Sequence, residues 1–270
     1  MADHVIECKN LSRNIERGKF YGIIGNNGSG KSTLCAILRG FAPAYFKGKL
    51  NGEVIFNGKD ISQYGYELSK MIGYVFQNPF TQISGIKETV FEEIAYGLEN
   101  FGTPVEEIEK RVIEVMKLTN TEELAMKNPY ELSGGQMQRV ALASVIVLNP
   151  DVLIIDEPTS QLDPQGTESV FEIIRKLKEQ KKTIILVEHK IDLIAEFTDH
   201  VIILKDGEVL KEGDTNSVLT DISLLEHGIA IPQVTQLAIQ LKENGLPINS
   251  ISVTEDSLLD ILKNLLGERG

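Results

Sequence analysis

The sequence predicts an α/β fold with a mostly parallel sheet, for three reasons. Strand-like and helix-periodic segments alternate along most of the 270 residues, the pattern that gives parallel strands with helical crossovers. A glycine-rich turn at residues 25–32 stands between a predicted strand and a predicted helix. A second apolar run at residues 152–155 ends in an Asp-Glu pair, and such a run is typical of a strand buried on both faces.

The glycine-rich turn matches the phosphate-binding pattern G-x-x-x-x-G-K-[ST] without a mismatch. Its backbone N–H groups and the positive end of the following helix both favour phosphate. We expect Lys31 to reach the outer phosphates and the Ser32 hydroxyl to bind Mg²⁺. The alternative is that the glycines only let a strand and a helix pack closely. The predicted nucleotide-binding residues of this turn are Gly25, Asn26, Asn27, Gly28, Ser29, Gly30, Lys31, Ser32 and Thr33.

The Asp-Glu pair supplies the acidic half of the predicted site. Ligands of open α/β sheets bind at the carboxyl ends of the strands, so we expect Asp156 to hold Mg²⁺, directly or through water. Glu157 is expected to point elsewhere and to act as the general base that polarises an attacking water. The alternative, a strand that ends in two solvated acids, is common for such a pair on its own.

Residues 132–136, Leu-Ser-Gly-Gly-Gln, stand at the start of another predicted helix. Ser133 is a good N-cap, and the two glycines allow close approach to the N–H donors of the helix. Taken alone, the pentapeptide could be an ordinary capped helix. Following the motifs above, it resembles the signature sequence of the ABC-type ATPases, and the next residues, Met-Gln-Arg-Val-Ala, also fit.

This resemblance implies a P-loop NTPase (RecA-like) core, with a helical subdomain inserted at about residues 80–148. It also implies that ATP and Mg²⁺ are sandwiched between the phosphate loop of one ATPase and the signature of a second. Ser133, Gly135 and Gln136 would then contact the nucleotide of the partner. The loop at residues 160–163 matches the family's dimer-contacting loop, except that Gln161 replaces a small residue.

Two single residues receive roles only through the resemblance. Gln77 would touch Mg²⁺ and the attacking water, and His189 would contact the γ-phosphate and orient that water. A lone histidine after a strand is more often structural, which is the alternative for His189.

A narrower resemblance, to the energy-coupling factor (ECF) and cobalt-importer branch, rests on residues 75–83, 93–100 and 228–245. It implies an importer subunit that energises uptake of a vitamin or a transition-metal ion. The implied partners are a second ABC ATPase, identical or different, a transmembrane coupling protein and a substrate-binding membrane protein. The implied place is the cytoplasmic face of a prokaryotic membrane. The alternatives are a degenerate, non-catalytic ABC ATPase partner and a soluble ABC-type ATPase.

Composition narrows these choices. A net charge of −12 argues against general nucleic-acid binding, which needs a basic surface. No apolar run approaches the roughly 20 residues of a membrane-spanning helix. Cys8 and Cys35 lie in apolar patterns and predict buried thiols rather than a disulfide.

The chain divides into a predicted ATPase domain at residues 1–214 and an accessory or dimerisation subdomain at 215–270. The second part is expected to be a small α/β extension with two amphipathic segments, at residues 234–241 and 258–266, separated by a turn at 244–247. The alternative is that both segments only add to the core. The first strand is predicted at residues 5–8.

One departure from the family pattern concerns base recognition. The resemblance implies a longer segment before the phosphate loop, carrying an aromatic side chain that stacks on adenine. Here Phe20 and Tyr21 lie inside the predicted strand and cannot serve. The platform is either absent or lies in a segment that this sequence does not include; if it is absent, ATP and GTP should be poorly distinguished.

Overall fold

The structure, a computed structural model, describes residues 11–267. The predicted strand at residues 5–8, with Cys8, lies outside this range. The chain forms two compact units. Among the described residues, unit 1 contains residues 11–14, Lys19–Lys31 and residues 188–267, whereas unit 2 contains Ile15–Gly18 and Ser32–Val187. Each unit carries its own part of the predicted site.

Unit 2 contains a parallel sheet in the order β4-β5-β6, formed by β4 (Ile72–Val75), β5 (Val152–Asp156) and β6 (Thr183–Val187). Nearly every residue of these strands is buried, as the Ile- and Val-rich sequences require for a sheet covered on both faces. The register pairs Val75 with Ile155, and Asp156 with Val187. The three strands therefore end at one edge of the sheet, which confirms the predicted buried strand before the acidic pair.

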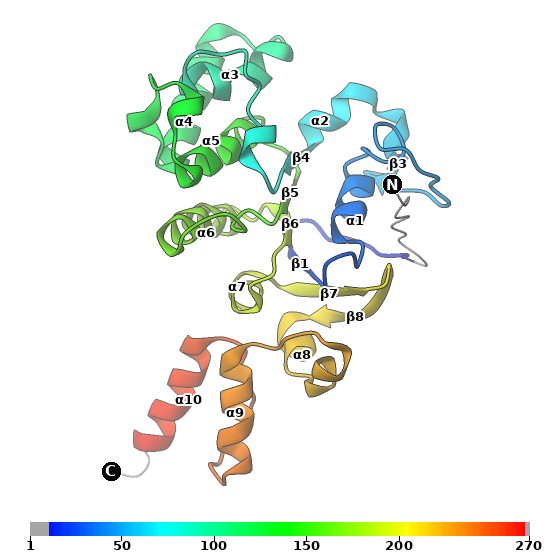
Figure 1. Ribbon diagram of the computed structural model, residues 1–270, viewed down its shortest axis with the longest axis vertical. Coiled ribbons are helices and arrows are strands. Elements are labelled where there is room, and N and C mark those ends of the chain that lie inside the picture. The colour runs from blue at the N-terminus through cyan, green and yellow to red at the C-terminus, as the bar shows by residue number, and fades with distance from the viewer. Residues whose placement is uncertain (1–10, 268–270) are drawn as a thin grey trace. The chain divides into compact units, whose positions relative to one another are not determined.

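The segment of unit 2 at residues 80–148 is rich in helices, and its assignment as a separate helical subdomain stays a prediction. It contains α3 (Val90–Asn100), α4 (Val105–Thr119) and α5 (Gly134–Ile146), which pack together as a group (Figure 1). Their apolar faces meet in one core that includes Val90, Ile94, Leu98, Val112, Met137 and Val140. The other elements of unit 2 are α1 (Lys31–Leu38, whose first residue belongs to unit 1), β2 (Ile55–Phe56), β3 (Lys59–Asp60), α2 (Leu68–Met71) and α6 (Pro164–Glu179).

Unit 1 contains the strand that leads into the phosphate loop. Here β1 (Phe20–Ile24) pairs in parallel with β7 (His200–Lys205), which pairs antiparallel with β8 (Glu208–Asp214). The β7–β8 turn has positive φ at both Asp206 and Gly207, as tight hairpin turns require. The helix α7 (Ile191–Phe197) approaches β1 so closely that a Cβ at Gly22 would lie 2.9 Å from Ile194 Cγ2.

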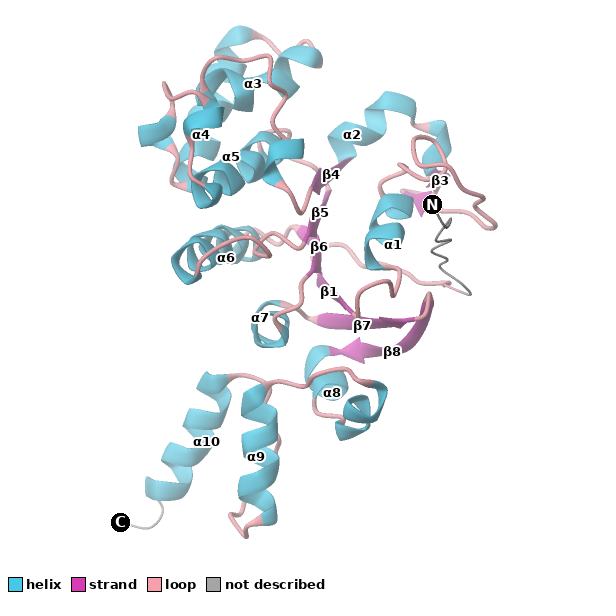
Figure 2. Cartoon of the chain, in the orientation of Figure 1, coloured by secondary structure: helices cyan, strands magenta, loops and turns pink. Residues whose placement is uncertain are grey.

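The C-terminal extension belongs to unit 1 and contains α8 (Thr215–Leu219), α9 (Gln233–Glu243) and α10 (Glu255–Gly267). Both predicted amphipathic segments are helices, and α9 and α10 lie side by side (Figures 1 and 2). The structure differs from the prediction in one detail. In the described part of the extension no strand follows β8, so the extension is helical rather than α/β. The assignment of separate functions to residues 1–214 and 215–270 stays a prediction.

Two sequence expectations can be compared with the described residues. Cys35 is a buried free thiol, as predicted. None of the helices formed by these residues is both long enough and apolar enough to span a membrane.

The close packing of β4 against α5 can be tested by substituting Gly73. A Cβ there would lie 2.5 Å from Val145 Cγ1 and 3.0 Å from Pro150 Cγ. We expect Gly73→Ala to lower the free energy of unfolding by about 1–3 kcal/mol, the usual cost of overpacking a core, measured by urea denaturation. Gly48→Ala is the control, because a Cβ at Gly48 meets nothing within 4 Å. Equal midpoints for the two variants would contradict this packing.

Candidate active site

The phosphate loop connects β1 to α1 and is shaped by its glycines. Gly25 has φ 153°, and a Cβ there would lie only 2.2 Å from the carbonyl oxygen of Leu204 and 2.6 Å from Ser29 Oγ. Ser29 donates its N–H to Asn26 O at 3.1 Å and accepts the N–H of Gly207 at 3.1 Å. The loop is therefore tied to the β7–β8 turn, in a conformation that only glycine permits at position 25.

Two side chains of this loop are buried in a way that suits an anionic ligand. Lys31 is 5% exposed, and its Nζ donates to the carbonyl oxygens of Gly25 at 2.9 Å and Asn26 at 3.3 Å. Because a buried ammonium needs acceptors, the loop carbonyls hold it in place. The buried Ser29 Oγ has no hydrogen-bond partner in the described part of the chain. A cation held beside an unsatisfied hydroxyl, at the start of a helix, fits phosphate.

Asp156 at the end of β5 is 6% exposed. Its Oδ2 accepts a hydrogen bond from the Tyr74 hydroxyl at 2.7 Å, whereas its Oδ1 is buried and has no hydrogen-bond partner among residues 11–267. Burial, and then the adjacent Asp156 carboxylate, raise the pKa of the Tyr74 hydroxyl above its usual range, so Tyr74 is a neutral donor. An unsatisfied carboxylate oxygen in a buried position is costly unless it meets a cation or a donor.

The residues predicted to hold Mg²⁺ are compatible with that ion. Ser32, Gln77 and Asp156 all belong to unit 2 and offer the hydroxyl, amide and carboxylate oxygens that Mg²⁺ prefers. The described residues contain no group of three or more His, Cys, Asp or Glu side chains able to hold a metal, so the nucleotide's phosphates would complete the set. When bound, Mg²⁺ neutralises charge on the phosphoryl group being transferred.

Glu157 is held away from Asp156 by its own contacts. Its backbone is left-handed, with φ 47°, and its N–H donates to Val187 O at 2.9 Å. Gln77 Nε2 donates to Glu157 Oε2 at 2.7 Å. The strand register explains this contact, because Gln77 follows β4 and Glu157 follows its neighbour β5. The structure thus brings together two predicted residues, Gln77 and Glu157, that the sequence did not pair.

The signature residues form the predicted helix cap. Ser133 Oγ accepts the N–H of Gln136 at 3.4 Å, and Gln136 Oε1 accepts the N–H of Ser133 at 3.1 Å, which is a capping box. Ser133 is exposed. A Cβ at Gly134 would meet only Leu162 Cδ2, at 4.0 Å. Neither left-handed backbone nor tight packing within this chain therefore requires glycine at that position.

The predicted site residues are divided between the two units. Unit 1 contains the loop residues up to Lys31, and also His189, which is exposed and follows β6 in the chain. Unit 2 contains Ser32, Thr33, Gln77, Ser133, Gly135, Gln136, Asp156 and Glu157. The roles of His189 and of the other site residues stay predictions. Tyr74 was missed, because only the pairing of β4 with β5 places it near Asp156.

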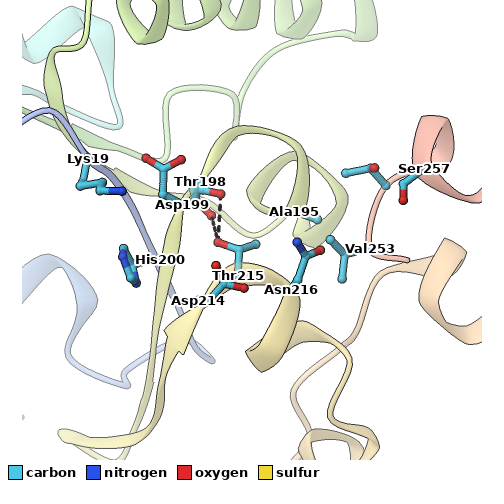
Figure 3. A pocket seen from close by; sticks show the side chains of 11 residues that line it. Lys19, Ala195, Thr198, Asp199, His200, Asp214, Thr215, Asn216, Val253 and Ser257 are labelled. Atoms are coloured by element: carbon cyan, nitrogen blue, oxygen red, sulfur yellow. Dashed lines mark hydrogen bonds between the residues drawn. The ribbon is translucent and has the colours of Figure 1, made fainter. Parts of the chain in front are cut away.

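A cavity of about 350 Å³ lies in unit 1 and contains none of the predicted site residues (Figure 3). It is lined by Lys19, Ala195, Thr198, Asp199, His200, Asp214, Thr215, Asn216, Val253, Thr254 and Ser257. The Thr215 hydroxyl donates to Thr198 O at 2.9 Å and secures one wall. The candidate active site therefore rests on the chemistry of the phosphate loop and the acidic pair rather than on this cavity.

Fold and site together define a P-loop ATPase of the ABC class. Along the chain, the order of elements is that of this class: a strand and phosphate loop, then the capped Leu-Ser-Gly-Gly-Gln helix, then a parallel strand that ends in the acidic pair. The model of the family described as "ABC transporter" matches residues 8–160. The chain belongs to this family, as an ATP-binding and ATP-hydrolysing subunit.

Related proteins match the sequence of this chain over nearly its full length. A putative ABC transporter ATP-binding protein of Pyrococcus abyssi is 40% identical over 260 residues, covering 95% of this chain and 92% of that protein. The energy-coupling factor transporter ATP-binding protein EcfA2 of Streptococcus pyogenes is 37% identical over 263 residues, with 94% and 91% covered. The predicted resemblance to the ABC-type ATPases, and to their ECF and cobalt-importer branch, is confirmed.

Two solved structures share the fold. The structure of cbiO1 from Clostridium perfringens, part of the ABC transporter complex cbiONQ, has a TM-score of 0.71 and 34% identity, covering 82% of this chain and 86% of that one. A dimeric ATP-binding cassette in a post-hydrolysis state, bound to ADP and Pi, has a TM-score of 0.66 and 34% identity, with 77% and 90% covered.

The close approach at Gly25 yields a test of the phosphate loop. Because a Cβ there would overlap the Leu204 carbonyl, Gly25→Ala must shift the loop backbone and misplace its N–H donors. We expect ATP affinity to fall at least about 10-fold, which corresponds to about 1.4 kcal/mol, measured by titration with a fluorescent ATP analogue. Gly48→Ala should bind like the unmodified chain. Unchanged affinity in Gly25→Ala would contradict this shape of the loop.

Proposed function

We propose that the chain is the ATP-hydrolysing subunit of an ECF-type importer, which energises uptake of a vitamin or a transition-metal ion through partner membrane proteins. The observation that carries this proposal is the relation to EcfA2, which covers 94% of the chain and therefore includes the C-terminal extension. The likeness to cbiO1, described as part of a transporter complex, supports the same assignment. The transported substrate would be chosen by a membrane partner.

Within this function the site residues have complementary tasks. Lys31 and the loop N–H groups would bind the phosphates, while Ser32, Gln77 and Asp156 would hold Mg²⁺. Glu157 would accept a proton from the attacking water, with its carboxylate oriented by the 2.7 Å hydrogen bond from Gln77. His189 would contact the γ-phosphate. The two acids have different hydrogen-bond partners, since Asp156 accepts from Tyr74 and Glu157 accepts from Gln77. This difference supports different roles for Asp156 and Glu157.

ATP would be sandwiched between the phosphate loop of one ATPase and the signature of the other, with Ser133, Gly135 and Gln136 as contacts. Ser133 is exposed, and the space beside Gly134 is open within this chain, so a second chain could approach this helix end. The related cassette solved with ADP and Pi is dimeric. Glycine at position 134 is what such an approach would require.

The proposed partners are a second ABC ATPase, a transmembrane coupling protein and a substrate-binding membrane protein, at the cytoplasmic face of a prokaryotic membrane. The extension offers an apolar surface for the ATPase partner, because Leu237 on α9 and Leu259 on α10 are exposed. The net charge of −12 disfavours nucleic acid as a partner. The presence of Lys31, Asp156 and Glu157 argues against the degenerate ABC ATPase alternative.

The assignment of Glu157 as general base can be tested with Glu157→Gln. The change keeps the size of the side chain but removes the base, so we expect ATP binding to persist while turnover falls by ~10²- to 10⁴-fold. Steady-state phosphate release and ATP-analogue binding measure the two effects, and the variant should accumulate an ATP-bound dimer. Glu168→Gln, an exposed change on α6, is the control. Turnover near that of the control would rule out Glu157 as the base.

The shared site can be tested by mixing two defective chains. Ser133→Arg should leave nucleotide binding at its own phosphate loop intact while blocking the site that it completes in its partner. Lys31→Ala should lose its own site and leave its signature intact. A mixed dimer of the two places both lesions in one composite site, so the other site should regain hydrolysis in a phosphate-release assay. Mixed dimers that form but stay inactive would refute the sandwich arrangement.

A further inference from the structure

Tyr74 lies on β4, beside the strand that ends in Asp156. The register pairs Tyr74 with Ile154, and because side chains alternate along a strand, Ile154 and Asp156 share one face of β5. Asp156 is thus the diagonal neighbour of Tyr74, within reach of a long aromatic side chain. The 2.7 Å hydrogen bond from the Tyr74 hydroxyl to Asp156 Oδ2 follows from this geometry.

This contact makes the two oxygens of Asp156 unequal. Oδ2 is held by a neutral donor, and Oδ1 is buried and unpartnered. A lysine or arginine in place of Tyr74 would neutralise the carboxylate and compete with a metal cation. A phenol instead fixes the orientation of the carboxylate while leaving its negative charge available.

The ring of Tyr74 is itself fixed by aromatic packing. Its centroid lies 4.8 Å from that of Phe76 and 5.5 Å from that of Phe41, and Phe41 and Phe76 stack with an interplanar angle of 6°. Tyr74 is only 8% exposed. Phe76 directly precedes Gln77, the donor to Glu157. One aromatic cluster therefore supports the side chains that orient both acids.

We propose that Tyr74 is a positioning residue of the metal site, whose hydroxyl orients Asp156 so that Oδ1 faces the Mg²⁺ of the bound nucleotide. The proposal rests on the proposed function, because that function assigns Asp156 to Mg²⁺. Outer groups that orient a metal ligand commonly change metal affinity 10- to 100-fold when they are removed. A purely structural hydrogen bond would affect stability and leave the metal dependence of binding unchanged.

The test is Tyr74→Phe in the full chain, which removes the hydroxyl and keeps the ring. We expect binding of the fluorescent ATP analogue in excess chelator to stay within about twofold, since the phosphate loop is intact. The Mg²⁺ concentration that half-saturates metal-dependent binding should rise about 10- to 100-fold, and Mn²⁺ binding to the nucleotide complex, followed by electron paramagnetic resonance, should weaken equally. Tyr64→Phe is the matched control, because the Tyr64 hydroxyl donates to Phe56 O at 2.7 Å, away from the acids.

Asp156→Asn separates failure of this proposal from failure of the proposed function. If Asp156→Asn weakens metal-dependent binding but Tyr74→Phe matches Tyr64→Phe, Tyr74 has no positioning role. If Asp156→Asn itself leaves metal dependence unchanged, the assignment of Asp156 to Mg²⁺ is wrong and the proposal falls with it. In the double variant, Tyr74→Phe should add no further loss. Should Tyr74→Phe fail to fold by thermal melting, Tyr74→Met provides the same removal of the donor with an adaptable side chain.

Discussion

The proposed active site depends on a carboxylate buried at the end of an apolar strand. The rest of β5 is Val-Leu-Ile-Ile, and Asp156 follows it with 6% of its surface exposed. Burying a charge in this way is costly unless partners compensate. Tyr74 satisfies one oxygen, and the other is left for a ligand. The sheet thus supplies rigidity, and in the proposed function the unsatisfied oxygen would supply affinity for a cation.

The parallel register brings a second set of side chains to the same edge of the sheet as this buried acid. Because β4 and β5 end at the same edge of the sheet, the residues that follow them meet there. The left-handed backbone of Glu157 turns its side chain toward Gln77 instead of Tyr74. Adjacent acids in sequence therefore acquire different partners, which is the condition for one to serve a metal and the other a proton.

What could be predicted from the sequence was local. The strand before Gly25, the helix after it, the buried strand before Asp156 and the cap at Ser133 are each set by contiguous residues, and each is confirmed. The pairs Tyr74–Asp156 and Gln77–Glu157 are separated by 82 and 80 residues, so only strand order reveals them. The extension was predicted to be α/β, but its described residues after β8 form helices without strands, because an amphipathic pattern predicts helices without showing whether strands accompany them.

Three glycines differ in whether contacts within the described chain require the absence of a side chain. Gly25 needs its left-handed φ and its missing Cβ because of the Leu204 carbonyl, and Gly73 needs space beside Val145. Neither a positive φ nor a close neighbour among the described residues requires glycine at position 134, because a Cβ there would lie 4.0 Å from its nearest neighbour. Gly134 is the first residue of α5, and a Cβ there would fit without displacing any described residue. The open space beside Gly134 is therefore consistent with the proposed shared site, in which another molecule approaches this helix end.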